Sequence, residues 1–137
     1  MTYNQFLDQI IDNGIEGAKR DYAKPEQKMK LRGAIAGFSI CRREDPHGLQ
    51  SLLKMAQEST QQARSEKSED YLYYRCYEAE IEWVCNCVSA LLYYNHMPVI
   101  VQPTARAAMA IQPIVAGQHV IFEPNVDDQS GDSCETQ

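Results

Sequence analysis

The chain has 137 residues, of which 44% are hydrophobic and 23% charged, a composition typical of one globular domain with enough chain to bury a core. No apolar run reaches the roughly 18 residues that a membrane-spanning helix needs, so we expect no membrane partner. The first residues lack the basic start and the continuous apolar stretch of a secretory signal, and from this we expect a cytoplasmic protein.

Charge is divided unequally along the chain, which has a net charge of −6. Residues 1–65 hold ten Lys and Arg against eight Asp and Glu, whereas residues 66–137 hold three against eleven. The acidic balance is not typical of a protein that reads nucleic acid. The one basic cluster, residues 19–32, keeps a nucleic-acid-binding regulator as an alternative. Its candidate basic patch is Lys24, Lys28 and Arg32.

Two helices are predicted in the first third of the chain, over residues 3–22 and 25–42. Thr2 or Asn4 can cap the first helix, because a short polar side chain accepts a bond from a free backbone N–H there. Pro25 separates the two, since proline disfavours helix in the residue before it and suits the first turn of the next helix.

Glycines interrupt both helices. Gly14 and Gly17 weaken the first one, so we expect a bend there or another element packed closely against them. Gly33 and Gly37 are four apart in the second one, and this spacing predicts a close helix crossing inside the core.

Two more helices are predicted after a polar loop at residues 42–48. The third helix covers residues 49–67, and its later turns become polar. The fourth covers residues 70–95 and is closed by Pro98.

The C-terminal part of the chain has a different pattern, with a mixed segment at residues 97–123. Residues 104–111 predict two turns of helix that stop before Pro113, and residues 114–122 give a hairpin signal around Gly117. Residues 124–137 are acidic and nearly free of apolar side chains, which predicts a disordered tail. The expected fold is mostly α, with a four-helix bundle-like domain over residues 1–123 and a short irregular or β-containing C-terminal segment.

The fourth predicted helix carries six of the eight tyrosines, the only tryptophan and three of the five cysteines. At helical spacing it presents two apolar stripes, although a surface helix usually needs only one. The helix therefore lies in the middle of the fold, or it faces its own core and a partner. Tyrosine and tryptophan are enriched at interfaces, so the second stripe predicts an interface. Its residues are Tyr73, Cys76, Trp83, Cys87 and Tyr94.

No pattern of cysteines, histidines or carboxylates predicts a metal site. The chain has no Cys-x-x-Cys, His-x-x-x-His or Glu-x-x-His motif. Cys85 and Cys87 point in different directions on a helix, so we expect them to be reduced and packed as small apolar side chains. We expect no cofactor. Glu78 and Glu82, which share a helical face, are the remaining metal candidates.

A catalytic alternative comes from the carboxylates. Glu66-Lys-Ser-Glu69 resembles the Glu-x-x-Glu motif with which all-α nucleotide pyrophosphohydrolases of the MazG kind hold magnesium. The Glu-x-x-Asp motif that such enzymes carry on the next helix is missing here. The resemblance is partial, and it implies a metal-dependent enzyme that uses helix carboxylates.

With no catalytic motif complete, we expect a small non-enzymatic protein–protein interaction module. It would act as a regulator, inhibitor or adaptor of another protein, and we also expect it to associate with itself as a homo-oligomer. Small acidic proteins of this kind are common products of phages and mobile elements.

Overall fold

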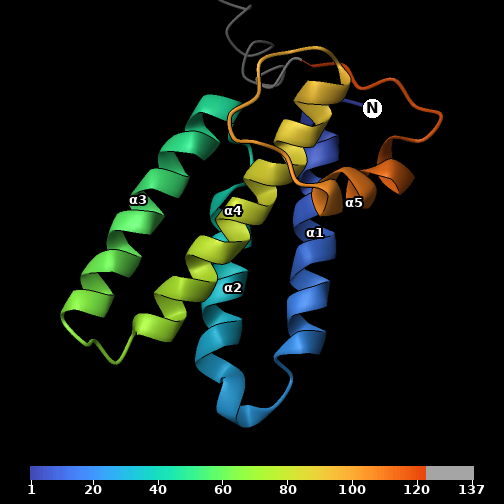
Figure 1. The fold of residues 1–137 in the computed structure, drawn as a ribbon. Coiled ribbons are helices and arrows are strands. Elements are labelled where there is room, and N and C mark those ends of the chain that lie inside the picture. The colour runs from blue at the N-terminus through green and yellow to red at the C-terminus, as the bar shows by residue number, and fades with distance from the viewer. Residues whose placement is uncertain (123–137) are drawn as a thin grey trace, which may run out of the picture.

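The structure is a computed structural model that describes residues 1–122. Within that range it contains five α-helices, a 3-10 turn and no strand, so the prediction of a mostly helical chain is confirmed (Figure 1). No helix in this range is both long and apolar enough to cross a membrane. The predicted disordered tail, residues 124–137, lies outside the described residues. The elements are α1 (Tyr3–Asp21), η1 (Pro25–Gln27), α2 (Lys28–Ile40), α3 (Pro46–Ser65), α4 (Tyr71–Tyr94) and α5 (Ala105–Val115).

Helix α4 is the central element of a bundle-like arrangement. It contacts α1, α2, α3 and α5, and Figure 1 shows it with α3 on one side and α1 on the other. Every residue from Cys87 to Leu92 is buried, so this part of α4 is enclosed on all sides. A helix that is apolar all round is stable only when neighbours cover it on every side, and α4 has such neighbours.

Helices α2 and α4 cross closely through the two glycines of α2, as the spacing predicted. A Cβ atom on Gly37 would lie 2.5 Å from the backbone oxygen of Tyr77, and one on Gly33 would collide with the backbone oxygen of Tyr73. In α1, the ring of Phe38 occupies the space beside Gly14. The missing side chains at Gly14, Gly33 and Gly37 therefore set the distances between α1, α2 and α4.

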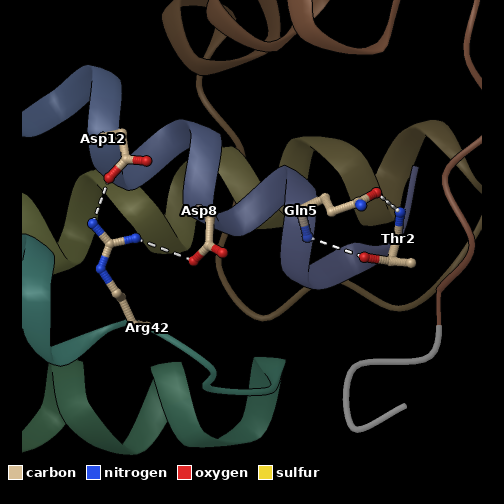
Figure 2. Close-up of polar contacts among 5 residues, drawn as sticks. All are labelled: Thr2, Gln5, Asp8, Asp12 and Arg42. Carbon is tan, nitrogen blue, oxygen red and sulfur yellow. Dashed lines mark hydrogen bonds and ion pairs between the residues drawn. The ribbon is translucent and has the colours of Figure 1, made fainter. Parts of the chain in front are cut away.

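The N-terminus of α1 is capped as its sequence predicts. The Thr2 hydroxyl accepts a bond from Gln5 N at 3.1 Å, and the Gln5 side chain accepts one from Thr2 N at 2.9 Å (Figure 2). Further along α1, Arg42 from the end of α2 pairs with Asp8 and Asp12, one helical turn apart. These contacts tie α1 to the α2–α3 connection.

Helix α3 begins three residues earlier than predicted, at Pro46. The Asp45 side chain accepts a bond from Gly48 N at 2.7 Å, and Pro46 occupies the first turn. The Asp-Pro pair is an N-cap followed by a proline that needs no N–H donor there. The prediction of a loop across residues 42–48 was wrong at this point, because the same residues also favour turns.

The C-terminal segment contains no hairpin, so that prediction was wrong. Helix α5 continues through Pro113 to Val115, because Ile111, Ile114 and Val115 extend its buried face. Among residues 116–122, the sole strand-like pairing is an isolated parallel bridge between Ile121 and Thr2. A short apolar run fits either a strand or the buried face of a helix, and here packing against α4 and α1 decides for helix.

Candidate docking surface

Charged side chains are almost absent from residues 83–122. Arg106 is the only Lys, Arg, Asp or Glu in this stretch of 40 residues, although 23% of the whole chain is charged. The stretch nevertheless carries six of the nine large apolar residues that are exposed within residues 1–122. Large exposed apolar side chains without charged neighbours are unusual on a monomeric protein and mark surfaces that bind something.

A pocket of about 400 Å³ lies between the C-terminal end of α4 and α5. None of its lining residues is charged. Tyr93 and Tyr94 stand at its rim with 70% and 64% of their surface exposed. The lining residues are Ala90, Tyr93, Tyr94, Gln102, Pro103, Thr104, Ala105, Ala108, Ile111 and Gln112.

Met109 extends this surface along α5. It is 73% exposed and lies on the same side of the helix as Ala105 and Gln112, because residues three and four apart share a helical face. We call Met109 together with the residues that line the pocket the candidate surface. It combines two tyrosines and a methionine, residue types that are enriched at interfaces, with uncharged smaller and polar residues.

The connection between α4 and α5 forms one wall of the pocket, and a buried serine holds it in place. The Ser89 hydroxyl, on α4, accepts bonds from Ile100 N at 3.1 Å and Val101 N at 3.0 Å. Thr104 then caps α5 by accepting a bond from Ala107 N at 3.1 Å. The connection is therefore held in its middle and at its C-terminal end, and the pocket is a formed feature of the fold.

Trp83 lies on α4 outside the candidate surface, and the side chain of Arg106 from α5 covers its ring. The guanidinium lies 5.3 Å from the centre of the Trp83 ring, which is a cation–π arrangement. Burial raises the pKa of the nearby Glu80 carboxyl to about 7, Asp21 adds to the rise, and Arg106 lowers it. The single charge of the low-charge stretch is thus held against α4 by an aromatic ring.

The structure places the five residues of the predicted interface in different environments, some buried and some exposed. Cys87 is fully buried inside the chain, and Trp83 is half-buried and packs against the core. Tyr73 is half-buried and stacks on Tyr77 with ring centres 6.2 Å apart, while Cys76 is half-buried beside Tyr22. Tyr94 alone belongs to the candidate surface, so the predicted stripe is mostly covered by α1, α2 and α5.

The four cysteines within residues 1–122 are free, as expected, and three of them, Cys41, Cys85 and Cys87, are core residues. Burial raises the pKa of Cys85 and of Cys87 to about 12, so both are protonated thiols at neutral pH. Cys41 is also fully buried, and burial likewise raises its pKa. A buried protonated thiol is a poor nucleophile and a poor metal ligand, which gives these side chains a packing role.

The remaining candidates lie apart from the candidate surface. Lys24, Lys28 and Arg32 are exposed around the α1–α2 turn, at the opposite end of the bundle from the C-terminus of α4 (Figure 1). Glu78 is half-buried and Glu82 exposed, both on α4. Nowhere in the described part of the chain do three His, Cys, Asp or Glu side chains gather as metal ligands would.

Tyr93, Met109 and the pocket residues of α5 were not predicted from the sequence. A signal was present, because only one charged residue occurs between Trp83 and Phe122. Helical periodicity identified two apolar stripes on α4, but it cannot show which of the two stripes a later helix covers.

Comparison of the chain with known protein families, with curated proteins and with solved structures finds no match.

Proposed function

We propose that this protein is a small protein–protein interaction module, a regulator, inhibitor or adaptor without catalysis of its own, that docks through the candidate surface. The observation that carries the proposal is an exposed group of tyrosine and methionine side chains around a formed pocket whose lining has no charge. Interfaces are depleted of charged residues at their centre and enriched in aromatic residues and methionine.

The rest of the described surface lacks this combination. Leu72 and Met55 are exposed apolar residues, but they stand among the charged and polar side chains of α3 and α4, such as Lys54, Arg75 and Glu58. Single exposed apolar residues of that kind are ordinary on a protein surface. They serve as controls for the residues of the candidate surface.

Photo-crosslinking tests the proposal whatever the identity of the partner. Tyr94→p-benzoylphenylalanine keeps an aromatic ring at the rim of the pocket, and Leu72→p-benzoylphenylalanine places the same group about 33 Å away along α4. We expect irradiation in the native host to give discrete protein adducts from position 94 and none from position 72. Equal labelling from both positions, or none from position 94, would overturn the proposal.

A further inference from the structure

We infer that the partner of the candidate surface is a second copy of this chain, which docks by a two-fold rotation that places equivalent surfaces against each other. This inference rests on the proposed function and adds the identity of the partner.

The first support is shape. Exposed side chains, Tyr93, Tyr94 and Met109, stand beside a pocket that is lined by smaller residues such as the buried Ala90 and the exposed Ala108. In a two-fold interface the same patch faces itself, so each projection needs a recess within the same patch. This surface provides both, and each copy can insert a rim side chain into the pocket of the other.

The second support is charge. The chain has a net charge of −6, so two copies repel each other wherever their carboxylates meet. No carboxylate lies between Glu82 and Glu123 in the sequence, and none lines the pocket. A basic partner would find no acidic residue here to bind, whereas a second uncharged surface of the same kind meets no repulsion.

Arg106 is the one charge that a two-fold contact through α5 would bring toward its own copy. The cation–π contact with Trp83 holds it against α4 of its own chain, with the guanidinium 5.3 Å from the ring centre. The guanidinium therefore has a favourable contact within its own protomer.

A lipid surface is the other apolar occupant to distinguish. Proteins that bind membranes through an amphipathic face carry several Lys or Arg residues beside the apolar ones, because cell membranes are anionic. The low-charge stretch has only Arg106, and the basic residues Lys24, Lys28 and Arg32 lie at the far end of the bundle. The arrangement favours a protein surface over a lipid one.

Sedimentation velocity of the full chain, from about 1 µM to about 1 mM, tests the inference over the range in which small interfaces dissociate. We expect a species of twice the 15.6 kDa chain mass that forms with increasing concentration. Tyr94→Glu and Met109→Glu should each weaken dimerisation by about 30-fold or more, the loss expected at a hot spot. Leu72→Glu, an exposed apolar position outside the surface, should leave it unchanged.

The outcomes separate this inference from the proposed function. A chain that remains monomeric at every concentration, or a dimer that Leu72→Glu weakens as much as Tyr94→Glu does, would overturn the second copy as partner. If position 94 then crosslinks to a different protein, the proposed function stands and only the partner changes. Co-sedimentation with phosphatidylcholine–phosphatidylserine vesicles that Tyr94→Glu abolishes would assign the surface to lipid and overturn both. Far-UV circular dichroism of each variant confirms that it is folded.

Discussion

At the scale of single residues, the glycines of α2 matter because they have no side chain, which leaves room for the backbone of α4. Gly37 lets the backbone of α4 approach so closely that a Cβ atom would lie 2.5 Å from Tyr77 O. That neighbour is a backbone atom of a central helix, so it cannot move aside at low cost. The close crossing explains why helix propensity, which disfavours glycine, does not decide these positions.

Two glycine-to-alanine substitutions should therefore have opposite effects on stability. Gly37→Ala forces α2 and α4 apart and should lower the free energy of unfolding by about 1–3 kcal/mol, as overpacked cores do. Gly17→Ala meets nothing closer than Arg20 at 3.9 Å and should raise it by up to about 1 kcal/mol through helix propensity. Urea denaturation of the two variants measures both. Equal effects of the two substitutions would rule out the close crossing as the reason for Gly37.

Glu80 should make stability depend on pH. Burial raises its pKa in the folded protein to about 7, from an ordinary value of 4.5, so the folded state binds the proton more tightly than the unfolded state does. The stability that this group contributes is complete below the unfolded pKa and is lost as the pH rises from 4.5 to about 7.

Glu80→Gln removes that loss, because glutamine stays neutral. We expect the variant to be more stable than the wild type at about pH 8 and to differ little from it at about pH 4. Urea denaturation of both proteins at the two pH values isolates Glu80, since the other carboxyl groups titrate equally in both. A stability difference that is the same at both pH values would show that Glu80 titrates normally in the folded state.

At the scale of elements, the four long helices could be predicted because their apolar periodicity is strong and each extends for several turns. The predicted ends of α1 and α4 lie within a residue of those observed. The beginning of α3 could not be predicted in the same way, because Asp45-Pro46 fits both a turn and a helix start. Helix α5 was predicted only over its first turns, since the choice between helix and hairpin after Pro113 depends on packing against α1 and α4.

The candidate surface could be predicted only in part for a related reason. An excess of aromatic residues led to the prediction of an interface on α4, and Tyr94 was among the predicted interface residues. Whether a stripe is covered depends on where α5 lies, and that follows from the contacts of Ala107, Ile111 and Ile114 in the core. Sequence periodicity shows which face of a helix is apolar, but it does not show which other helix packs against that face.

The connection between α4 and α5 should depend on Ser89. Ser89→Ala leaves Ile100 N and Val101 N without their shared acceptor in a partly buried place, which should cost about 1–3 kcal/mol of unfolding free energy. Ser51→Ala, at an exposed position of α3, is the matched control and should change little. Hydrogen exchange at residues 100 and 101 should accelerate in the first variant. Unchanged protection there would mean that Ser89 does not hold the connection.

At the scale of the whole molecule, the two ends of the bundle differ in character. The turns at one end carry Lys24 and Lys28 beside η1 and α2, and Glu66, Glu69 and Asp70 between α3 and α4 (Figure 1). The other end contains the C-terminus of α4 and the low-charge stretch, together with the charged α2–α3 connection at Arg42, Arg43, Glu44 and Asp45. Under the proposed function, the low-charge stretch is the part of this end where association would occur.

Methionine oxidation tests docking of two copies through the candidate surface most directly, because the two most exposed methionines within residues 1–122 lie one on that surface and one away from it. Met109 on α5 and Met55 on α3 are 73% and 61% exposed, so dilute hydrogen peroxide should oxidise both at similar rates in dilute protein. We expect oxidation of Met109 to slow as the protein concentration rises, in proportion to the fraction of dimer, while oxidation of Met55 keeps its rate. A Met109 rate that does not depend on concentration, or equal protection of Met55, would contradict docking of two copies through the candidate surface.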